Sequence, residues 1–395
     1  MKGEIYKRNI FIPVFLFSLV MIVSNCTSGK QPNDSLGDEI TKITIDPYSR
    51  PEGKLTLSEI IDSMTFIPLE TNDKCLIAYV SKCIFSDNHI LLYCSVARRC
   101  YLFSRTGHFI TQIGDVGQGP SEYIIVSDLL QLNEQNNQII IRNLKPNKLL
   151  YYDFEGQFIK SVSLNFDPGA FSYHNGFYLL KNINEGNTLY TYKIWDEDFN
   201  LLFQKVKPKS FVMNPPNSGV AMGTPFCQYL FNNQVHVREN MLNDTLYRID
   251  DDFSFIPKYV INAGKYELTL EMRSNRDIFL REAKSCPTVT SIFETKDFLF
   301  LNYLLSIERY NCYYHKKEKN TLYFPSSSGI PNDHNGGFDF WPQQMVSDKE
   351  MMCAYSAERL LKLDKLKITD EKLKHVLNSL KEDSNPVIAI VTLKD

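Results

Sequence analysis

The sequence lacks an excess of positive charge. Its 395 residues carry 43 lysines and arginines against 46 aspartates and glutamates, which gives a formal net charge of −3. A protein that binds a nucleic-acid backbone normally presents a basic face, so this balance argues against a nucleic-acid partner. Tryptophan is also scarce, with 2 residues, whereas 26 phenylalanines and 22 tyrosines favour β-strands. The hydrophobic content of 43% is enough for a packed core and excludes global disorder.

The short motifs of common catalytic and metal sites are absent too. No G-x-S-x-G elbow of a serine hydrolase occurs, and the seven histidines form no H-E-x-x-H pair for zinc. The run Asp250-Asp251-Asp252 lacks the ligand spacing and the glycine of an EF-hand, so we expect a solvated turn there. Motifs therefore predict no metal, no cofactor and no catalytic residue.

One long apolar run is present, from Ile10 to Val23, and it follows a basic N-terminus. The run is too short to span a bilayer comfortably, so it predicts a signal peptide over residues 1–25. It ends in Val23-Ser24-Asn25-Cys26, which resembles a bacterial lipobox, and in that class the cysteine becomes the acylated first residue of the mature protein. The alternative is an ordinary secretory signal with an accidental cysteine.

Residues 26–53 contain many Ser, Gly, Pro, Asn and Asp residues and are predicted to form a flexible tether. Acyl chains on Cys26 would hold the protein on a membrane through this tether. Thr27, rather than aspartate, follows the cysteine, which resembles sorting to the outer membrane. Lipoproteins on the surface of Bacteroidota cells often carry an acidic cluster after the cysteine, and residues 27–31 lack one. Attachment to the periplasmic face and to the cell surface both stay open.

Eight further cysteines have irregular spacings and form no C-x-x-C pair. Most lie in apolar, strand-like runs, which favours buried free thiols over a disulfide framework. An exported compartment would permit disulfides. A bridge, if one forms, is expected among Cys83, Cys94 and Cys100.

From residue 77 onward the chain repeats a pattern of four short strands separated by polar turns. The first two copies run from Ile77 to Ile113 and from Ile124 to Leu164, and both place an aromatic residue four positions before a turn glycine, at Gly107 and Gly156. Looser copies follow, and the marker tyrosines of the five copies are Tyr101, Tyr151, Tyr192, Tyr247 and Tyr313. A period of roughly 40–50 residues with four strands is typical of a propeller blade, whose two faces are covered by neighbouring blades.

Two terminal strands complete the pattern. Met64–Leu69 and Val387–Leu393 both alternate, and pairing the first with the last strand of a ring hides otherwise exposed edges. We therefore predict an all-β fold, a six-bladed β-propeller over residues 54–395, with short helical insertions in the C-terminal blades. A separate C-terminal helical domain fits poorly, because an apolar strand follows the helices. The helical patterns cover Glu267–Ala283, Asp348–Leu363 and Thr369–Lys381, the last with Thr369 as its N-cap.

Three segments resemble the six-bladed β-propeller lipoproteins of Bacteroidota. Ile113–Tyr123 resembles the family's G-x-x-G-Q-G-P-x-E-Y segment, with Ser121 where glycine is commoner. Ile61–Thr71 and the Gly-Gly and aromatic-Trp-Pro segment within Asn332–Pro342 match in the same order. The resemblance covers nearly the whole mature chain. It implies a propeller related to proteins with NHL repeats and carries over no catalytic residues.

The glycine-rich segment is not a phosphate loop, because it lacks the G-K-[ST] ending and a strand rather than a helix follows it. Its residues Gln118, Glu122 and Tyr123 lie where one blade passes to the next, and they are candidate ligand-binding residues. The alternative is a hydrogen-bonded clamp between blades.

The segment from Asn332 to Trp341 is the second candidate for recognition. Asp339 supplies charge and Trp341 supplies a flat stacking face, although Trp341 could instead be a core plug between blades. If both passages reach the same end of the ring, the five candidates form one polar and aromatic patch suited to a sugar or a peptide.

These observations favour a non-catalytic binding or scaffold module for a glycan, a peptide or a partner protein, anchored in the outer membrane. The alternative is a propeller hydrolase or lyase with a carboxylate or metal site in the central channel. Convergent Asp, Glu and His side chains near the axis would favour the enzyme, and an apolar or scattered lining would favour the binder.

Overall fold

The computed structural model describes most of the chain after residue 39. The predicted signal peptide over residues 1–25, Cys26 and the first part of the predicted tether lie outside the described residues. The described residues are 40–49, 55–165, 169–174, 176–182, 189–206, 227–238, 244–324 and 328–395. Within these ranges no helix is long and apolar enough to cross a bilayer.

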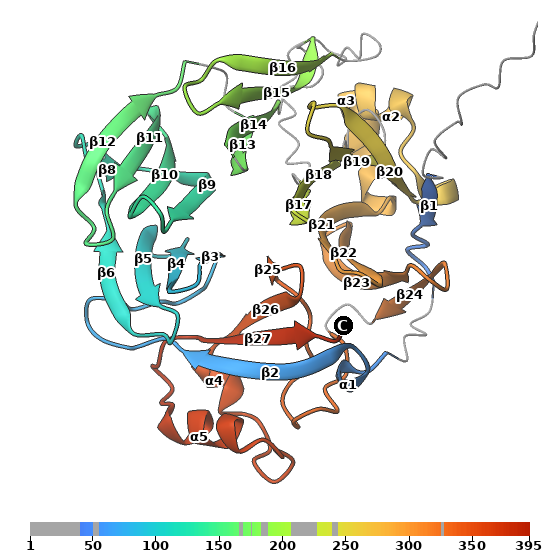
Figure 1. The fold of residues 1–395 in the computed structure, drawn as a ribbon. Coiled ribbons are helices and arrows are strands. Elements are labelled where there is room, and N and C mark those ends of the chain that lie inside the picture. Colours follow the sequence, from blue (N-terminus) through green and yellow to red (C-terminus); the bar gives the residue numbers. More distant parts are fainter. Residues whose placement is uncertain are drawn as a thin grey trace, which may run out of the picture. The chain divides into compact units, whose positions relative to one another are not determined.

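Six antiparallel sheets surround a common axis and form a six-bladed β-propeller, as the repeats predict (Figure 1). In blades 1 to 5 consecutive strands pair in chain order from the axis outward. Blade 1 contains β3 (Lys82–Phe85), β4 (His89–Cys94), β5 (Arg99–Ser104) and β6 (Phe109–Ile113). Blade 2 contains β9 (Val126–Asn133), β10 (Gln138–Leu144), β11 (Asn147–Tyr152) and β12 (Phe158–Ser163). Blade 3 contains β13 (Gly169–His174), β14 (Phe177–Asn182), β15 (Tyr190–Asp196) and β16 (Leu201–Val206). Blade 4 contains β17 (Gln228–Phe231), β18 (Gln234–Arg238), β19 (Thr245–Ile249) and β20 (Phe255–Asn262). Blade 5 contains β21 (Thr288–Glu294), β22 (Phe298–Leu305), β23 (Glu308–His315) and β24 (Asn320–Phe324).

Blade 6 closes the ring with strands from both ends of the propeller sequence. Its inner strands are β25 (Gln344–Ser347), β26 (Glu350–Tyr355) and β27 (Val387–Leu393), and its outer strand is β2 (Ile61–Pro68). The register pairs Ile61 with Leu393 and Pro68 with Val387. The outer edge of β27 is thereby covered by β2, which confirms the predicted closure.

A further strand lies inside the range that the sequence assigned to the tether. β1 (Thr41–Thr44) pairs in parallel with the outer strand β20 of blade 4. Ile43 and Ile45 are each 1% exposed, so burial of this alternating segment holds the chain on the blade. The predicted tether of residues 26–53 is therefore too long at its C-terminal end. A short parallel pair, β7 (Asp115–Val116) and β8 (Glu122–Tyr123), lies within the glycine-rich passage.

The helices lie in the connections, and one predicted helix is wrong. The helical elements are α1 (Leu57–Ile60), η1 (Gly264–Tyr266), α2 (Leu270–Ser274), α3 (Arg276–Glu282), η2 (Ala283–Ser285), α4 (Ala357–Leu360) and α5 (Glu371–Ser379). The predicted helix over Asp348–Leu363 is instead strand β26 followed by the single turn α4, because β26 pairs on both sides with β25 and β27. The N-cap of α5 is Asp370 rather than Thr369, and its side chain accepts the backbone N–H of Lys372.

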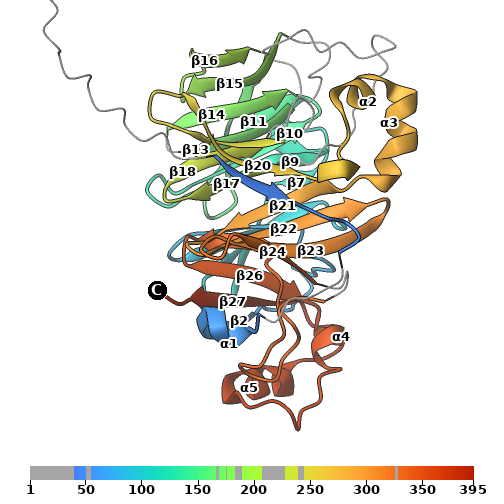
Figure 2. The same ribbon diagram turned by 90° about the vertical axis from the view of Figure 1, so that its right-hand side faces the viewer.

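The ring has two different ends. We call the end with the turns between first and second strands the hairpin end, and the opposite end, where passages reach the first strand of the next blade, the connection end. The hairpin-end turns are short, whereas the connection end carries α2 and α3 before blade 5 and α4 and α5 within blade 6. In Figure 2 the helices α2, α3 and α4 lie toward the right, and the C-terminus lies on the left.

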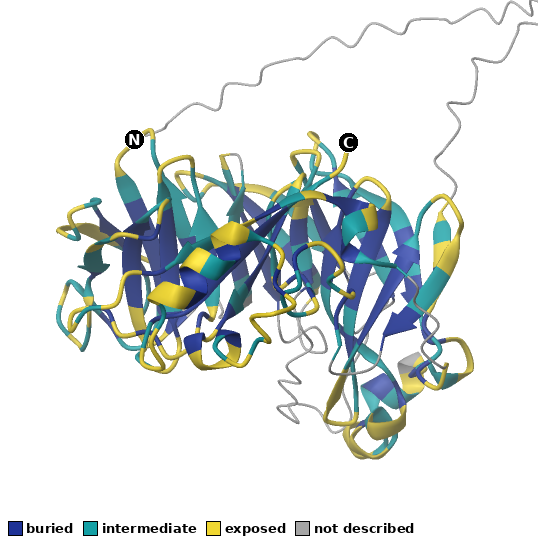
Figure 3. Ribbon diagram, turned by 90° about the horizontal axis from the view of Figure 1, so that it is seen from below, coloured by how far each residue is buried: buried dark blue, intermediate teal, exposed yellow. Residues whose placement is uncertain are grey.

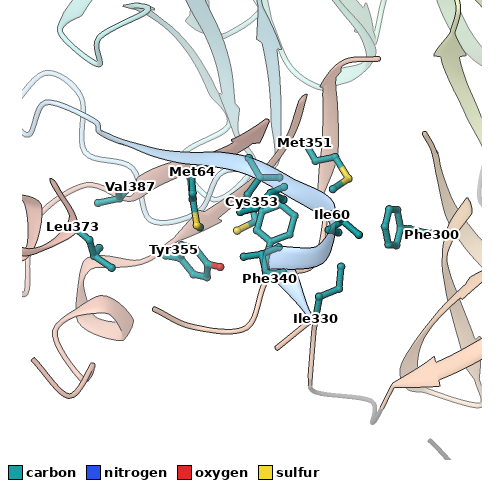
Figure 4. Close-up of a cluster of buried hydrophobic side chains, with 14 of the residues drawn as sticks. Ile60, Met64, Phe300, Ile330, Phe340, Met351, Cys353, Tyr355, Leu373 and Val387 are labelled. Carbon is teal, nitrogen blue, oxygen red and sulfur yellow. The ribbon is translucent and has the colours of Figure 1, made fainter. Parts of the chain in front are cut away.

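The core consists of apolar layers between neighbouring blades, as the burial colours of Figure 3 show. The largest cluster joins blades 5 and 6 and includes Phe300, Phe340 and Leu373, each 0% exposed (Figure 4). Complete burial of one such side chain contributes about 1.5–3 kcal/mol. All eight cysteines after residue 40 are buried free thiols. Burial raises the pKa of the Cys83 and Cys100 thiols, which keeps them protonated and unreactive.

Candidate functional site

The glycine-rich passage from blade 1 to blade 2 is held together by buried hydrogen bonds. Tyr123 is 0% exposed, and its hydroxyl accepts the backbone N–H of Cys100 at 3.1 Å and donates to the carbonyl of Ile113 at 3.0 Å. From blade 2, the Tyr152 hydroxyl donates to the carbonyl of Ser121 at 2.7 Å. Burial raises the pKa of the Tyr123 phenol, so the donating proton is retained. This placement argues against a ligand contact by Tyr123.

The other two candidates of this passage have different environments. The Glu122 carboxylate accepts the backbone N–H of Gly119 at 2.8 Å. It lies so close to the loop that a Cβ on Gly117 would be 1.9 Å from Glu122 Oε2. Gln118 is exposed. The passage therefore has the geometry of the clamp alternative, and of its three candidate residues only Gln118 is exposed.

The passage from blade 5 to blade 6 is shaped by a different set of contacts. Ile330 and Phe340 exchange two backbone hydrogen bonds of 2.7 and 3.0 Å, which close the segment into a loop. Gly336 at its tip has φ +77°, and a Cβ there would lie 2.1 Å from the carbonyl oxygen of Lys367. The loop thus needs glycine at this position. Its return strand brings Asp339 and Trp341 to the start of β25.

A hollow of about 540 Å³ opens beside this passage at the connection end. We call it the connection-end hollow. It lies between blades 5 and 6 and the start of blade 1, and its lining includes Tyr79, Ser291, Asn302, Arg309, Asp339, Trp341, Gln343 and Arg359. A volume of this size is within the range of small-molecule sites. Most of the lining side chains carry a hydroxyl, an amide or a charge.

Trp341 packs against neighbouring aromatic rings and also lines the connection-end hollow. Its ring meets Phe300 and Phe324 edge-on, with 5.6 Å between ring centroids in both pairs. These contacts fix the indole between blades 5 and 6. Trp341 also lines the connection-end hollow, and its buried Nε1–H has no hydrogen-bond partner. A buried donor without a partner costs about 1–3 kcal/mol, so this atom is an energetically unfavourable feature of the wall of the hollow.

Two arginines line the same hollow, and neither forms an ion pair with a described residue. Arg309 follows Glu308, whose carboxylate accepts the Tyr310 hydroxyl at 2.6 Å. Arg359 follows Glu358, which pairs with Lys362 at 2.6 Å. The neighbouring carboxylates are therefore bonded to other groups. The guanidinium of Arg359 lies over the rings of Phe338 and Tyr355, 4.6 and 5.4 Å from their centroids.

The structure brings together two of the five sequence-predicted residues. Both passages reach the connection end, but of the five candidates only Asp339 and Trp341 line the hollow. The predicted single patch with Gln118, Glu122 and Tyr123 is not found there. Sequence reasoning missed Arg309 and Arg359, which lie 50 positions apart and belong to no shared motif. Pairing of β23 with its neighbours and the turn α4 bring them to one hollow.

A larger hollow of about 890 Å³ lies at the hairpin end between blades 5 and 6. Its charged groups are engaged with one another: Lys349 pairs with Asp395, and His315 lies 4.0 Å from Glu318. Lys394 donates to the carbonyl of Ser58 at 2.6 Å. None of its lining side chains has a buried polar atom without a partner. Its size alone therefore does not make it the candidate site.

Polar side chains also meet near the axis, where the first strands of blades 3 and 4 are neighbours. Gln228 of β17 bonds the Ser172 hydroxyl and contacts His174 of β13. Burial lowers the pKa of His174 to about 4, with a smaller contribution from Lys82. Among the described residues no group of three His, Cys, Asp or Glu side chains could hold a metal ion.

Comparison with known proteins places this fold in a family. The family described as "Domain of unknown function (DUF4934)" matches residues 40–392. The chain belongs to the DUF4934 family. The match begins before β1 and ends one residue before the end of β27, and it contains the residues that line the connection-end hollow. No curated protein matches this DUF4934 chain by sequence.

Two solved structures share the fold of this DUF4934 protein. A Bacteroides fragilis protein thought to be exported is 20% identical, with a TM-score of 0.68; the match covers 90% of this chain and 100% of that one. A member of the DUF4221 family from Bacteroides vulgatus is 9% identical, with a TM-score of 0.50 and coverage of 85% and 97%. Both comparisons support the propeller architecture.

Proposed function

We propose that this DUF4934 propeller is a non-catalytic binding module whose ligand occupies the connection-end hollow. The observation that carries the proposal is the lining of this hollow. It includes the aromatic side chain of Trp341 together with Arg309 and Arg359, and neither arginine forms an ion pair with a described residue. A rigid ring of blades positions these groups before the ligand arrives, which reduces the entropy cost of binding. The ligand classes are a glycan, a peptide or a segment of a partner protein.

The test is a glycan and peptide array probed with residues 40–395, first as wild type and then as Trp341→Ala. We expect Trp341→Ala to weaken binding at least about tenfold, because the variant loses the aromatic surface that lines the hollow. Circular dichroism and a thermal melt must show that the variant is folded. Gln118→Ala on the other passage is the matched control and should bind as wild type. If Trp341→Ala binds as strongly as the wild type, the ligand does not bind in the connection-end hollow.

We propose further that the propeller is held on the outer membrane through acyl chains on Cys26. The support is the sequence Val23-Ser24-Asn25-Cys26 at the end of the apolar run. The chain between Cys26 and Ile40 would then connect the lipid anchor to the propeller. The same arrangement serves on the periplasmic face and on the cell surface.

This second proposal is tested by replacing Cys26 with alanine and fractionating the cells. We expect the Cys26→Ala protein to leave the membrane fraction, whereas Cys75→Ala, which removes a buried thiol, should stay with it. A Cys26→Ala protein that remains as membrane-bound as wild type would place the anchor elsewhere.

A further inference from the structure

The connection-end hollow has an uneven supply of hydrogen-bond donors and acceptors. Arg309, Arg359 and the Trp341 Nε1–H are donors without a described acceptor, and the two guanidinium groups cannot become acceptors. Asp339 is the one carboxylate in the lining, and its Oδ1 lies 3.4 Å from the backbone N–H of Asn332. A ligand that satisfies this set must bring more acceptors than donors, and at least one of those acceptors should carry negative charge.

The geometry points to a carboxylate-bearing oligosaccharide as the ligand of this hollow, an inference that rests on the proposed function and names its ligand class. A planar carboxylate matches the fork of a guanidinium, and Arg309 and Arg359 provide two such forks on the walls formed by blades 5 and 6. The Arg359 guanidinium is held over two rings, which orients it before binding. The Trp341 side chain, which also lines the hollow, would contact the sugar.

The rest of the lining favours a sugar over a peptide. Ser291 and Thr290 offer hydroxyl groups, and Asn302 and Gln343 offer side-chain amides. Asn302 donates to Asn311 at 2.6 Å, which fixes its amide and leaves its oxygen toward further donors. Sugar hydroxyl groups both donate and accept, so they can satisfy amides and hydroxyls together with the Asp339 carboxylate. A peptide has fewer groups that can do both, because its backbone N–H only donates and its C=O only accepts.

The experiment uses pairs of oligosaccharides that differ only in charge. Oligosaccharides containing uronic or sialic acid are immobilised beside their carboxyl-reduced, neutral forms, together with acidic peptides of similar length. We expect residues 40–395 to bind at least one acidic oligosaccharide about tenfold or more tightly than its reduced form, because a charge-assisted hydrogen bond is lost on reduction. The acidic peptides should bind more weakly than that oligosaccharide.

Three variants assign the charge preference to the hollow. Arg309→Gln and Arg359→Gln should each reduce the ratio between acidic and reduced forms by about tenfold. The control is Arg276→Gln, an exposed arginine on α3 at the same end but outside the hollow, and it should leave the ratio unchanged. Arg309 is exposed at the start of β23, so its variant should fold even if Arg359→Gln does not.

The outcomes separate this inference from the proposed function. If the wild type binds acidic and reduced forms equally, and Trp341→Ala abolishes that binding, the inference is wrong. The proposed binding module would then still stand. Stronger binding of acidic peptides would do the same. An equal loss for Arg276→Gln and Arg309→Gln would also overturn it, because the preference would then be a long-range charge effect. Failure of every glycan and peptide to bind would count against both.

Discussion

Two passages carry the chain to the first strand of a blade at the connection end, and they differ in how their buried polar groups are satisfied. In the glycine-rich passage the Tyr123 hydroxyl has both a donor and an acceptor inside the protein. In the passage to blade 6 the Trp341 Nε1–H has neither a protein acceptor nor access to solvent. A satisfied group stabilises the fold, whereas an orphaned buried donor costs free energy.

The largest expected effect tests how tightly the glycine-rich passage is packed. Gly114 has φ +60°, and a Cβ there would lie 2.6 Å from the Tyr152 hydroxyl oxygen. Gly114→Ala should lower the free energy of unfolding by roughly 2–4 kcal/mol, from backbone strain and overpacking together. Gly337 in the other passage is outside the left-handed region, and its nearest neighbours would be 3.0 Å away. Gly337→Ala should cost less than about 1 kcal/mol, and denaturant titration of both variants makes the comparison. Equal losses would contradict the difference in packing.

A smaller effect separates stability from binding. Tyr123→Phe removes the hydroxyl and leaves the buried Cys100 N–H without its acceptor, which should cost about 1–3 kcal/mol of unfolding free energy. The affinity for an array ligand should not change, because Tyr123 is buried away from the hollow. Trp341→Phe removes no internal hydrogen bond, and its main effect should be a loss of affinity of about tenfold. Denaturant titration and calorimetry on the two variants should therefore give opposite patterns. If Tyr123→Phe weakens binding as much as Trp341→Phe does, the passages are not distinct.

The smallest expected effect is in the connection between blades 4 and 5. Charged groups form ion pairs there, but burial disfavours the ionised form of the Glu267 carboxyl. Asp244 accepts from Arg238 and Arg273 at 2.8 Å each. Burial of Glu267 and its proximity to Asp244 raise the pKa of Glu267 from 4.5 to about 7. The folded state therefore binds a proton that the unfolded state releases between about pH 4.5 and 7. Stability from this group is present below pH 4.5 and is lost as the pH rises toward 7.

Hydrogen exchange of α2 and α3, corrected for intrinsic rates, checks this pH dependence. We expect protection to fall modestly between pH 5 and pH 8 in the wild type and to be flat in Glu267→Gln. Glu271→Gln on the exposed side of α2 is the control and should keep the wild-type slope. A wild-type slope in Glu267→Gln would show that another group is responsible.

The fold could be predicted where the repeats carry matched turns. Gly107 and Gly156 take positive φ in the turns before the outer strands of blades 1 and 2, so their spacing in the sequence reports a real backbone requirement. The segment Glu350–Tyr355 could not be assigned in this way. Its apolar run suits a helix or a buried strand, and only pairing with β25 and β27 decides between them. β1 was missed because its partner strand β20 is more than 200 positions away.

The site was predictable only in part, for a similar reason. The sequence singles out Asp339 and Trp341 because a scarce tryptophan follows a glycine pair. It cannot show that Trp341 Nε1 has no acceptor, or that Glu308 and Glu358 are bonded to Tyr310 and Lys362 rather than to the arginines beside them. Those hydrogen bonds depend on the folded structure, and the spacing of residues along the sequence does not reveal them.

The central claim is that a ligand binds beside Trp341, and the fluorescence of that residue tests it most directly. The chain has 2 tryptophans, and the other, Trp195, is 8% exposed in the core of blade 3. Trp195→Phe leaves Trp341 as the single reporter. Titration with the strongest array ligand should change its emission saturably, with the dissociation constant that calorimetry gives for the same variant. Saturable binding by calorimetry with no change in Trp341 emission would contradict the account.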